Sequence, residues 1–317
     1  MKRYVLRRSA QSLVVLVIVT IVVFAILHFL PGSPARAILG IKASPGAIRA
    51  FNAANGYNRS LPVQYVLYLD HLVHGQLGFS YHLDQSVGSL LTLDLPKSAL
   101  LVGLSYLIAL IIAVPMGLAQ ALRRNRPLDH GFTAFSFVGY SMPVFWLGML
   151  LIIVFSVKLH LFPAEGPQGA SVGNVLQNPS GLVLPVATLT IVTVAQFSRF
   201  MRSAAIDTML QDYIRTAQAK GVPRRSVIIR HVLRNSLLPI VTLVGLSLPG
   251  VLSGAVVVEA LFNYPGMGWL FWTAASAHDY PVLMGFTVVV GAATVIGNLV
   301  ADLAYAAMDP RIRYGSR

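Results

Sequence analysis

The sequence predicts an all-α integral membrane protein with six transmembrane helices. Of its 317 residues, 56% are hydrophobic and only 11% are charged, whereas soluble domains carry about 25% charged residues. The mean hydropathy is +0.69. A soluble fold of this length would still need a polar surface, and this chain lacks the residues to form one. Composition therefore places it among membrane proteins.

Six apolar segments are long enough to cross the roughly 30 Å hydrocarbon core of a bilayer. They lie near residues 10–30, 98–121, 132–157, 182–200, 238–258 and 283–306. The first has no small-residue cleavage site after it, so we expect a retained helix rather than a signal peptide. Thr188, Thr190 and Thr193 dilute the fourth, but threonine hydroxyls can bond back to the preceding helical turn.

The basic residues predict the orientation of these helices. An even number of spans puts both termini on one side. With the N-terminus inside, segments 1–9, 122–131, 199–237 and 307–317 are cytoplasmic and hold 4, 3, 8 and 3 Lys and Arg residues, 18 of the chain's 24. This asymmetry predicts a cytoplasmic N-terminus and C-terminus. It also accounts for most of the net charge of +13, so we expect no nucleic-acid partner.

Residues 31–97 form the one long segment expected outside the cytoplasm. It is too polar to span the membrane. Val66, Leu69 and Val73 recur at helical spacing between Pro62 and Gly75, which predicts an amphipathic helix on the outer face or packed on the bundle. Covering helix ends and binding a partner are both consistent with this pattern.

Residues 212–239 form a basic segment between two apolar runs, with distinct start and stop signals. A short helix from Tyr213 to Lys220 is expected to stop at Gly221, which can adopt the left-handed cap conformation. Pro223 lies near the start of a second helical stretch, and Pro239 marks the start of the next apolar run. The pattern indicates a docking element rather than the shortest connection between two helices.

Proline and glycine also occur within the expected spans. Pro115 with Gly117 and Pro143 with Gly139 predict local kinks, because neighbouring helices can satisfy the backbone groups that proline frees. We expect these breaks to be structural rather than to mark a binding site.

Residues that would indicate chemistry are scarce. The chain has no cysteine, no Walker A sequence and no HExxH motif. Ser247 and Ser253 are intramembrane serines, but the last helix has no histidine that could serve as a base. Asp302 lies near the cytoplasmic end of the last helix, too shallow for a proton-coupling acid. We expect no catalytic site and no metal site.

Three stretches together resemble one family of transporters. The sequence RTAQAKGVPRRSVIIRHVLRNSLLP resembles the EAA loop of ABC-importer permeases, in the version typical of dipeptide, oligopeptide and nickel permeases. Two other stretches are similar to the same subfamily. One is VVVEALFNYPGMGWLFWTAASAHDYPVLMG, followed by NLVADLAYAAMDPRIRYG, and the other is NRSLPVQYVLYLDHLVHGQLGFS. The resemblance covers the chain from about residue 55 to the C-terminus.

Two departures from the family pattern stand out. The Glu-Ala-Ala that names the loop is replaced by Arg215-Thr216-Ala217, although the glycine four residues later is present as Gly221. Gln76 stands where the family commonly has an aspartate before Leu-Gly.

The resemblance implies a type I ABC importer transmembrane domain that translocates dipeptides or oligopeptides across the cytoplasmic membrane of a prokaryote. Its domains would be a first helix (1–30), an extracytoplasmic segment (31–97), a transmembrane domain (98–306) with a cytoplasmic coupling loop at 201–237, and a tail (307–317). The implied partners are a second homologous permease, two ATPase subunits, an extracytoplasmic substrate-binding protein and membrane lipid. ATP and Mg²⁺ would bind the ATPases, and this chain would carry no cofactor.

The residues expected to couple this chain to an ATPase belong to the family's loop. They are Arg215, Thr216, Ala217, Ala219, Lys220, Gly221 and Pro223. Small residues would allow close approach to a groove, and the basic ones could pair with acidic groups or with anionic lipid. Two alternatives stay open: a permease for nickel or another small solute of the same family, and a secondary transporter.

Overall fold

A computed structural model describes residues 2–29, 35, 39–40, 43–54, 56–80, 82–253 and 255–308. The predicted C-terminal tail, 307–317, lies almost wholly outside these residues. The described chain is helical nearly throughout, as predicted, and divides into two compact units. Unit 1 contains residues 1–98, 252–256 and 265–317, and unit 2 contains residues 99–251 and 257–264.

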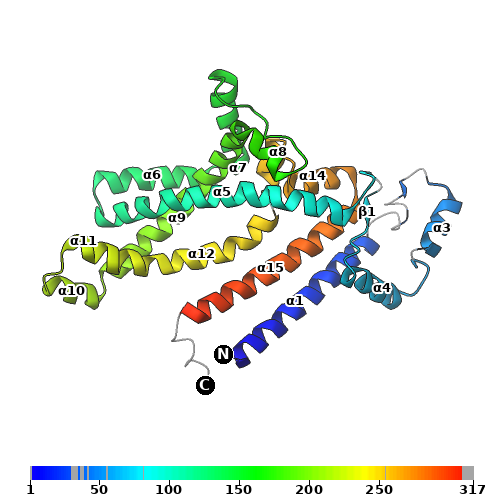
Figure 1. The fold of residues 1–317 in the computed structure, drawn as a ribbon, viewed down its shortest axis with the longest axis horizontal. Coiled ribbons are helices and arrows are strands. Elements are labelled where there is room, and N and C mark those ends of the chain that lie inside the picture. Colours follow the sequence, from blue (N-terminus) through cyan, green and yellow to red (C-terminus); the bar gives the residue numbers. More distant parts are fainter. Residues whose placement is uncertain are drawn as a thin grey trace. The chain divides into compact units, whose positions relative to one another are not determined.

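Unit 1 is built around two long helices that pack side by side (Figure 1). Its elements are α1 (Lys2–Phe29), α3 (Pro45–Ala54), α4 (Leu61–Val73), β1 (Phe79–Ser80), β2 (Gln85–Ser86), the first turns of α5 (Val87–Leu122), α14 (Met267–Ala277) and α15 (Tyr280–Met308). The two strands form a small antiparallel hairpin in which Phe79 pairs with Ser86. Gly291 of α15 faces Val19 of α1, and its missing side chain lets the helices approach closely.

The core of unit 1 joins the start of α5 to α14 and α15. Val87, Leu91, Met267, Leu270 and Phe286 are buried against one another there. Such contacts are the main source of helix stability in a folded chain.

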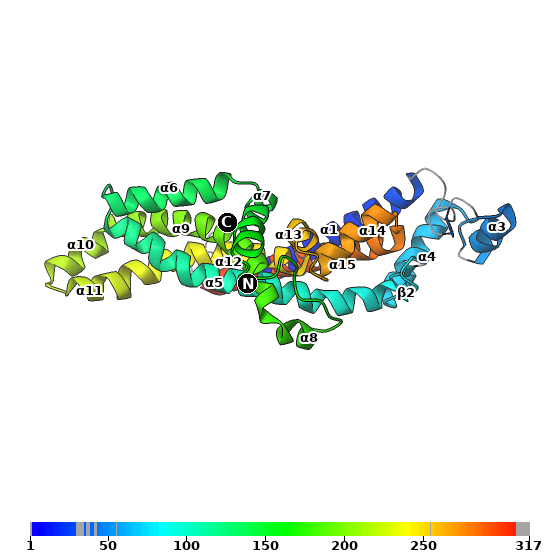
Figure 2. The same cartoon turned by 90° about the horizontal axis from the view of Figure 1, so that it is seen from above.

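Unit 2 gathers the remaining helices around α9 (Figure 2). Its elements are the rest of α5, α6 (Pro127–Ser141), α7 (Val144–Leu151), the π-helical η1 (Ile152–Lys158), α8 (Val172–Gln177), η2 (Pro179–Leu182), α9 (Val183–Met209), α10 (Asp212–Ala219), α11 (Arg224–Ser226), the π-helical η3 (Val227–Leu233), most of α12 (Arg234–Ser253) and most of α13 (Val256–Leu261). Gly117 of α5 lies against α9: a side chain there would approach the Ser198 carbonyl oxygen to 2.5 Å. The expectation of a structural glycine at this site agrees with that packing.

The predicted third span, 132–157, is divided in the structure. Helix α6 ends at Ser141, and the α7–η1 helix that follows is bent from it by 105°. Met142 is extended, with φ −76° and ψ 132°, because the ring of the following Pro143 disfavours helical backbone in the residue before it. The expected kink is therefore a complete break.

Within the described residues, four helices are long and apolar enough to cross a membrane, or up to five if the bent pair is one span. The four cover Val87–Leu122, Pro179–Met209, Arg224–Gly245 and Tyr280–Leu299. They contain or largely overlap the second, fourth and sixth predicted spans. The fifth span was predicted at 238–258, but the corresponding helix begins earlier, at Arg224. Pro239 therefore lies inside α12 rather than at the start of the apolar helix. The described apolar part of the first, Ser9–Ala25, is a shorter helix.

The hydroxyl groups of α9 behave as predicted. Thr188 Oγ1 donates to the Leu184 carbonyl and Thr193 Oγ1 to the Leu189 carbonyl, each at 2.8 Å. Thr190 Oγ1 instead donates across to the Ser105 carbonyl of α5 at 3.3 Å. These bonds satisfy the hydroxyls inside the bundle, so their polarity is compatible with an apolar helix.

Candidate functional site: the segment between α9 and α12

Helix α10 ends in the way the sequence predicts. Lys220 is its C-cap, and Gly221 follows with φ +76°. The Val222 amide donates to the Ala217 carbonyl at 3.2 Å, and the Gly221 amide donates to the Gln218 carbonyl at 2.9 Å. These two bonds form a Schellman motif, which satisfies carbonyls that a helix end would otherwise leave unpaired. Pro223 then provides the N-cap of α11.

Gly221 is required by its backbone conformation rather than by crowding. A Cβ built at Gly221 meets no atom within 4 Å. Its positive φ, however, is one that residues with side chains adopt only at a cost of about 1–2 kcal/mol. The glycine therefore sets the direction of the chain, and the space beside it is open.

The inner face of α10 is anchored to unit 2 by a hydrophobic cluster. Ile214 is buried among Ala121 of α5, Ala205 of α9, and Val227 and Val232 of η3. The half-buried Ala217 and Val222, which are the two ends of the Schellman bond, pack against the same cluster. The short helix is thus fixed to both of the helices that it connects.

Two hydrogen bonds reinforce this anchoring. The Asn235 side-chain amide donates to the Tyr213 hydroxyl at 3.0 Å, which joins α12 to α10. The buried Ser236 hydroxyl lies 3.2 Å from Thr208 Oγ1, which joins α12 to the end of α9. In Figures 1 and 2, α10 and α11 lie together at the same end of unit 2 as the end of α9.

The outer face of α10 and its turn are exposed. Of the predicted coupling residues, only Ala217 is half-buried; Arg215, Thr216, Ala219, Lys220, Gly221 and Pro223 are all exposed. The Arg215 guanidinium lies 3.7 Å from the Asp212 carboxylate, one turn back, in a solvent-exposed pair. The structure therefore brings the predicted residues together as one surface with short side chains beside two cations.

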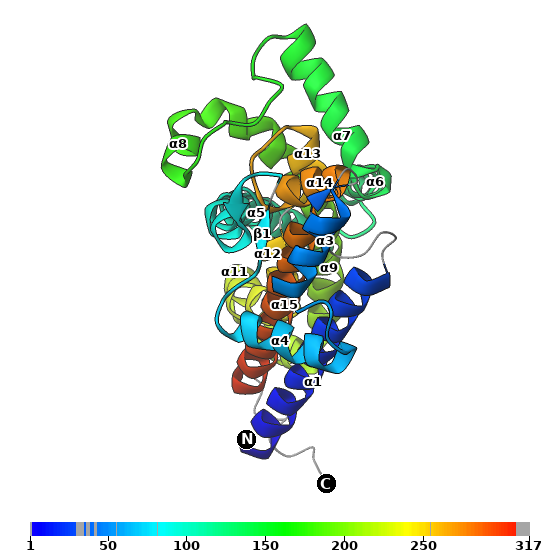
Figure 3. The same cartoon turned by 90° about the vertical axis from the view of Figure 1, so that its right-hand side faces the viewer.

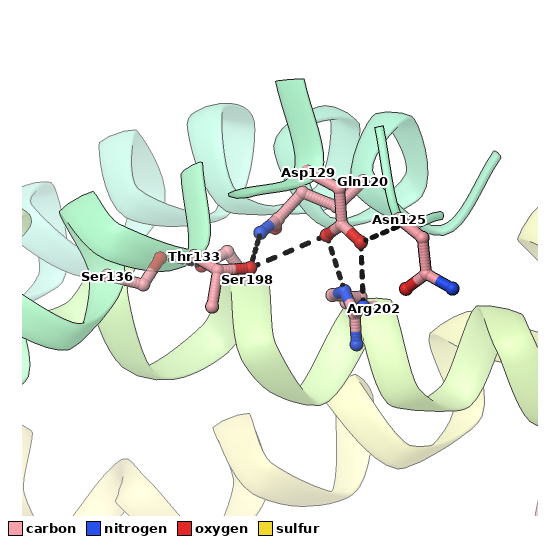
Figure 4. A network of polar contacts seen from close by, with 7 residues as sticks. All are labelled: Gln120, Asn125, Asp129, Thr133, Ser136, Ser198 and Arg202. Carbon is pink, nitrogen blue, oxygen red and sulfur yellow. Dashed lines mark hydrogen bonds and ion pairs between the residues drawn. The ribbon is translucent and has the colours of Figure 1, made fainter. Parts of the chain in front are cut away.

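A buried polar network near this segment was not predicted. Arg202 of α9 donates to both carboxylate oxygens of Asp129 in α6, at 2.7 and 2.8 Å (Figure 4). The Asn125 amide donates to the same carboxylate at 2.9 Å, and Thr133 Oγ1 lies 3.4 Å from it. Paired, two-pronged bonds of this kind are among the strongest in proteins.

The network continues along the α6–α9 contact. The Gln120 side-chain amide donates to Thr133 at 3.3 Å, and the Ser136 and Ser198 hydroxyls lie 3.1 Å apart (Figure 4). Polar side chains of α5, α6 and α9 are thus joined at the end of unit 2 that also carries α10. The feature of the sequence that could have indicated this network is Asp129, an acidic residue in the first turn of α6 that closely follows Arg123, Arg124 and Arg126.

The amphipathic helix predicted near residues 62–75 is present as α4, which crosses α1 in unit 1 (Figure 3). Its apolar residues do not all face the protein: Val66 is 64% exposed and Val73 is 85% exposed. The buried residue of α4 is Gln64, whose amide donates to the carbonyls of Tyr57 and Arg59. Part of the apolar face is therefore available to lipid or to a partner.

Of Ser247, Ser253 and Asp302, only Ser247 has a side chain that the structure describes. Ser247 Oγ donates to the Leu243 carbonyl of its own helix at 2.8 Å. The side chains of Ser253 and Asp302 lie outside the described residues. Within the described part of the chain, no group of three or more His, Asp or Glu side chains could hold a metal ion.

Comparisons with known proteins identify the family. Residues 109–314 match the family described as "Binding-protein-dependent transport system inner membrane component", and residues 1–99 match its N-terminal counterpart. The chain is 39% identical to the oligopeptide transport system permease protein AppB of Bacillus subtilis (strain 168), over 99% of this chain and 100% of that protein.

Two further relatives are similar over almost their whole length. A probable D,D-dipeptide transport system permease protein of Escherichia coli (strain K12) is 36% identical over 98% of each chain. The oligopeptide transport system permease protein OppB of Haemophilus influenzae is 35% identical over 99% of this chain and 100% of that protein. The chain therefore belongs to the family of binding-protein-dependent inner-membrane transport components, the non-catalytic permease subunits of ABC transporters.

Proposed function

We propose that this chain is the permease subunit of an ATP-driven importer of dipeptides and oligopeptides, moved by an ATPase that docks on α10. The carrying observation is the contrast between the two faces of α10: Ile214 is buried in a cluster shared with α5, α9 and η3, while Arg215 and Ala219 are exposed. The peptide substrate is supported by the names of the three relatives.

The exposed face of α10 suits docking in a groove. Thr216, Ala219 and Gly221 have short side chains or none, so a partner surface can approach the backbone closely. Arg215 and Lys220 flank them and would pair with acidic groups of the ATPase. Since Asp212 already lies near Arg215 at 3.7 Å, docking would exchange a weak exposed pair for one shielded from water.

Force applied to α10 would pass to the membrane helices through its buried face. The cluster around Ile214 and the Tyr213–Asn235 bond join α10 to α9 and α12, and the Ser236–Thr208 contact joins α9 and α12 to each other. Closure of two ATPases would then move these helices as a rigid body, a rocking motion between two states. The Asp129–Arg202 pair would carry that motion to α6.

The topology follows from placing this segment in the cytoplasm. Both termini and the loop 201–237 would lie inside, the segment 31–97 outside, and 98–306 would form the transmembrane domain. Six spans result if α1 and the bent α6–α7 pair each count as one. The complete importer would contain this chain, a second homologous permease, two ATPases holding ATP and Mg²⁺, and an external binding protein.

Replacing Gly221 by Trp tests the coupling assignment. The new side chain would project into open space, where the ATPase is expected, and so would obstruct docking. Gly221→Ala is the matched control, because alanine also has a side chain that disfavours the positive φ at this position but lacks the bulk of tryptophan. In the reconstituted complex, we expect peptide-stimulated ATP hydrolysis and uptake of a labelled oligopeptide to fall at least tenfold in Gly221→Trp, while Gly221→Ala retains most of both.

Each outcome has a defined meaning. Normal uptake and stimulated hydrolysis in Gly221→Trp would refute docking at α10. Loss of activity to the same extent in Gly221→Ala would indicate a backbone effect instead. Failure of the wild-type complex to import any oligopeptide while it accumulates a nickel chelate would contradict the substrate class but leave the coupling segment untouched.

A further inference from the structure

Unit 1 contains a cavity of about 540 Å³ that the transport mechanism does not use. Small-ligand sites in proteins commonly measure about 300–1,000 Å³. Its walls come from α1, α3, α4, the loops before α4 and β1, the β1–β2 hairpin, the start of α5 and the first turns of α15. Its apolar side chains include Phe24, Leu67, Leu72, Phe79, Met284 and Val288.

The lining combines apolar side chains with polar ones, which are Tyr57, Gln64, Tyr68, His71, Gln76 and Ser86. Among the described residues that form it there is no Asp, Glu, Lys or Arg. Burial raises the pKa of the Tyr68 hydroxyl to about 12, so this group stays neutral. The Gln64 amide, a further polar group of the lining, is engaged by the carbonyls of Tyr57 and Arg59. A zwitterionic peptide or a phosphate would find no Asp, Glu, Lys or Arg side chain to pair with here, whereas the apolar side chains of the lining suit a hydrocarbon chain.

Two of the helices that line the cavity are apolar. Pro281, Met284 and Val288 line it, and α15 is a candidate span from Tyr280 onward. At 1.5 Å per residue, the wall formed by these residues reaches about 12 Å along the helix from the start of that span. Phe24, on the other long helix, falls within the apolar stretch of α1. In a membrane, these two parts of the wall would lie beside acyl chains.

Aromatic contacts hold the wall between α1 and α4 in place. The Phe24 ring packs against Tyr65 at 5.3 Å and against Tyr68 at 5.9 Å between ring centroids. The Tyr65 hydroxyl lies 2.9 Å from Thr20 Oγ1, which fixes the same two helices by a polar contact. A cavity walled by such contacts is formed before its occupant arrives.

We propose that this cavity binds one acyl chain of a membrane phospholipid, with the headgroup outside at the level of α4. Val66 and Val73, the exposed apolar residues of α4, would contact the acyl chains of neighbouring lipids in the same leaflet. This inference rests on the family's membrane location and on the cavity, and is independent of how the ATPase docks.

Gly88 offers a way to fill the cavity without a clash. It lines the cavity, and a Cβ built on it meets no atom within 4 Å. Gly88→Leu would therefore extend an apolar side chain into the space, and leucine also favours the helix. Gly103→Leu is the matched control: it lies in the same helix, also meets no atom within 4 Å, and is not part of the lining.

The experiment uses the complete transporter in nanodiscs that contain a phosphatidylethanolamine with a diazirine near the end of one acyl chain. After illumination and digestion, mass spectrometry would locate the label. We expect labelled peptides from α4 and from the start of α15 in the wild type and in Gly103→Leu, and at least a tenfold loss of that label in Gly88→Leu. If Gly88→Leu fails to assemble, Met284→Trp fills the same cavity from α15.

Equal labelling in Gly88→Leu and Gly103→Leu would overturn the proposal, as would the absence of label from the lining residues in the wild type. A photoreactive amino acid at His71, on the same cavity, distinguishes the occupants. Capture of the binding protein or of the second permease there, in place of lipid, would also overturn it.

Discussion

Two ion pairs of unit 2 have the same chemistry and opposite surroundings. Asp129–Arg202 joins α6 to α9, and its side chains are 2% and 29% exposed. Asp212–Arg215 lies within α10, and its side chains are 96% and 71% exposed. The first pair has further hydrogen bonds from Asn125 and Thr133; the second is longer, at 3.7 Å, and lies in water.

The difference shows which charges hold the permease together and which are available to a partner. Breaking a buried pair leaves a charge that solvent cannot satisfy, at a cost of about 3–5 kcal/mol. An exposed pair contributes about 0–1 kcal/mol. Substitutions on the two sides should therefore separate stability from transport.

The largest effect is expected at Asp129. Asp129→Asn removes the negative charge and one of the two oxygens that accept from Arg202, and it should lower the free energy of unfolding by about 3 kcal/mol, the lower end of the range because Arg202 keeps partial access to solvent. Thermal unfolding of the purified permease in detergent measures this loss of stability. Asp212→Asn is the control and should change stability by less than about 0.5 kcal/mol. Equal effects at the two sites would show that the buried pair contributes no more to stability than the exposed one.

This pair also marks the limit of what the sequence could predict. The end of α10 was predicted correctly, because a cap glycine and a following proline act within a few residues of the chain. Asp129 and Arg202 are 73 positions apart; Arg202 was counted among the cytoplasmic basic residues, and Asp129 was given no role. Only the packing of α6 on α9 brings them together.

The break between α6 and α7 shows a similar limit. Pro143 predicted a kink, and its effect on Met142 is local. The size of the bend, 105°, is not a local property, because α7 also packs against α9 and Gly148 against Leu261 and Phe262 of the α13 region. Periodicity likewise predicted α4 but not which of its residues would be buried.

An intermediate effect is expected at Ile214. Ile214→Ala empties part of the cluster that α10 shares with α5, α9 and η3, and such truncations cost about 2–5 kcal/mol when buried; we expect about 2 kcal/mol, because a surface segment can partly collapse around the gap. Ile229→Ala, in the same segment but 50% exposed, should cost less than about 0.5 kcal/mol. The midpoints of thermal unfolding compare the two variants. A larger loss at Ile229 would show that α10 is not anchored by its buried face.

The smallest effect on stability, and the sharpest separation from function, is expected at Arg215. Arg215→Glu breaks only an exposed pair, so the free energy of unfolding should change by less than about 0.5 kcal/mol. If acidic groups of an ATPase face this position, reversing the charge introduces repulsion at the interface, which typically costs several kcal/mol. Uptake by the complete transporter should then fall at least fivefold, with binding of the ATPase weakened in proportion. Arg225→Glu, on the neighbouring α11 and also exposed, is the matched control for net charge and should leave uptake near the wild-type rate. Equal losses in both variants would mean that the ATPase responds to the overall basic charge of the segment and not to the outer face of α10.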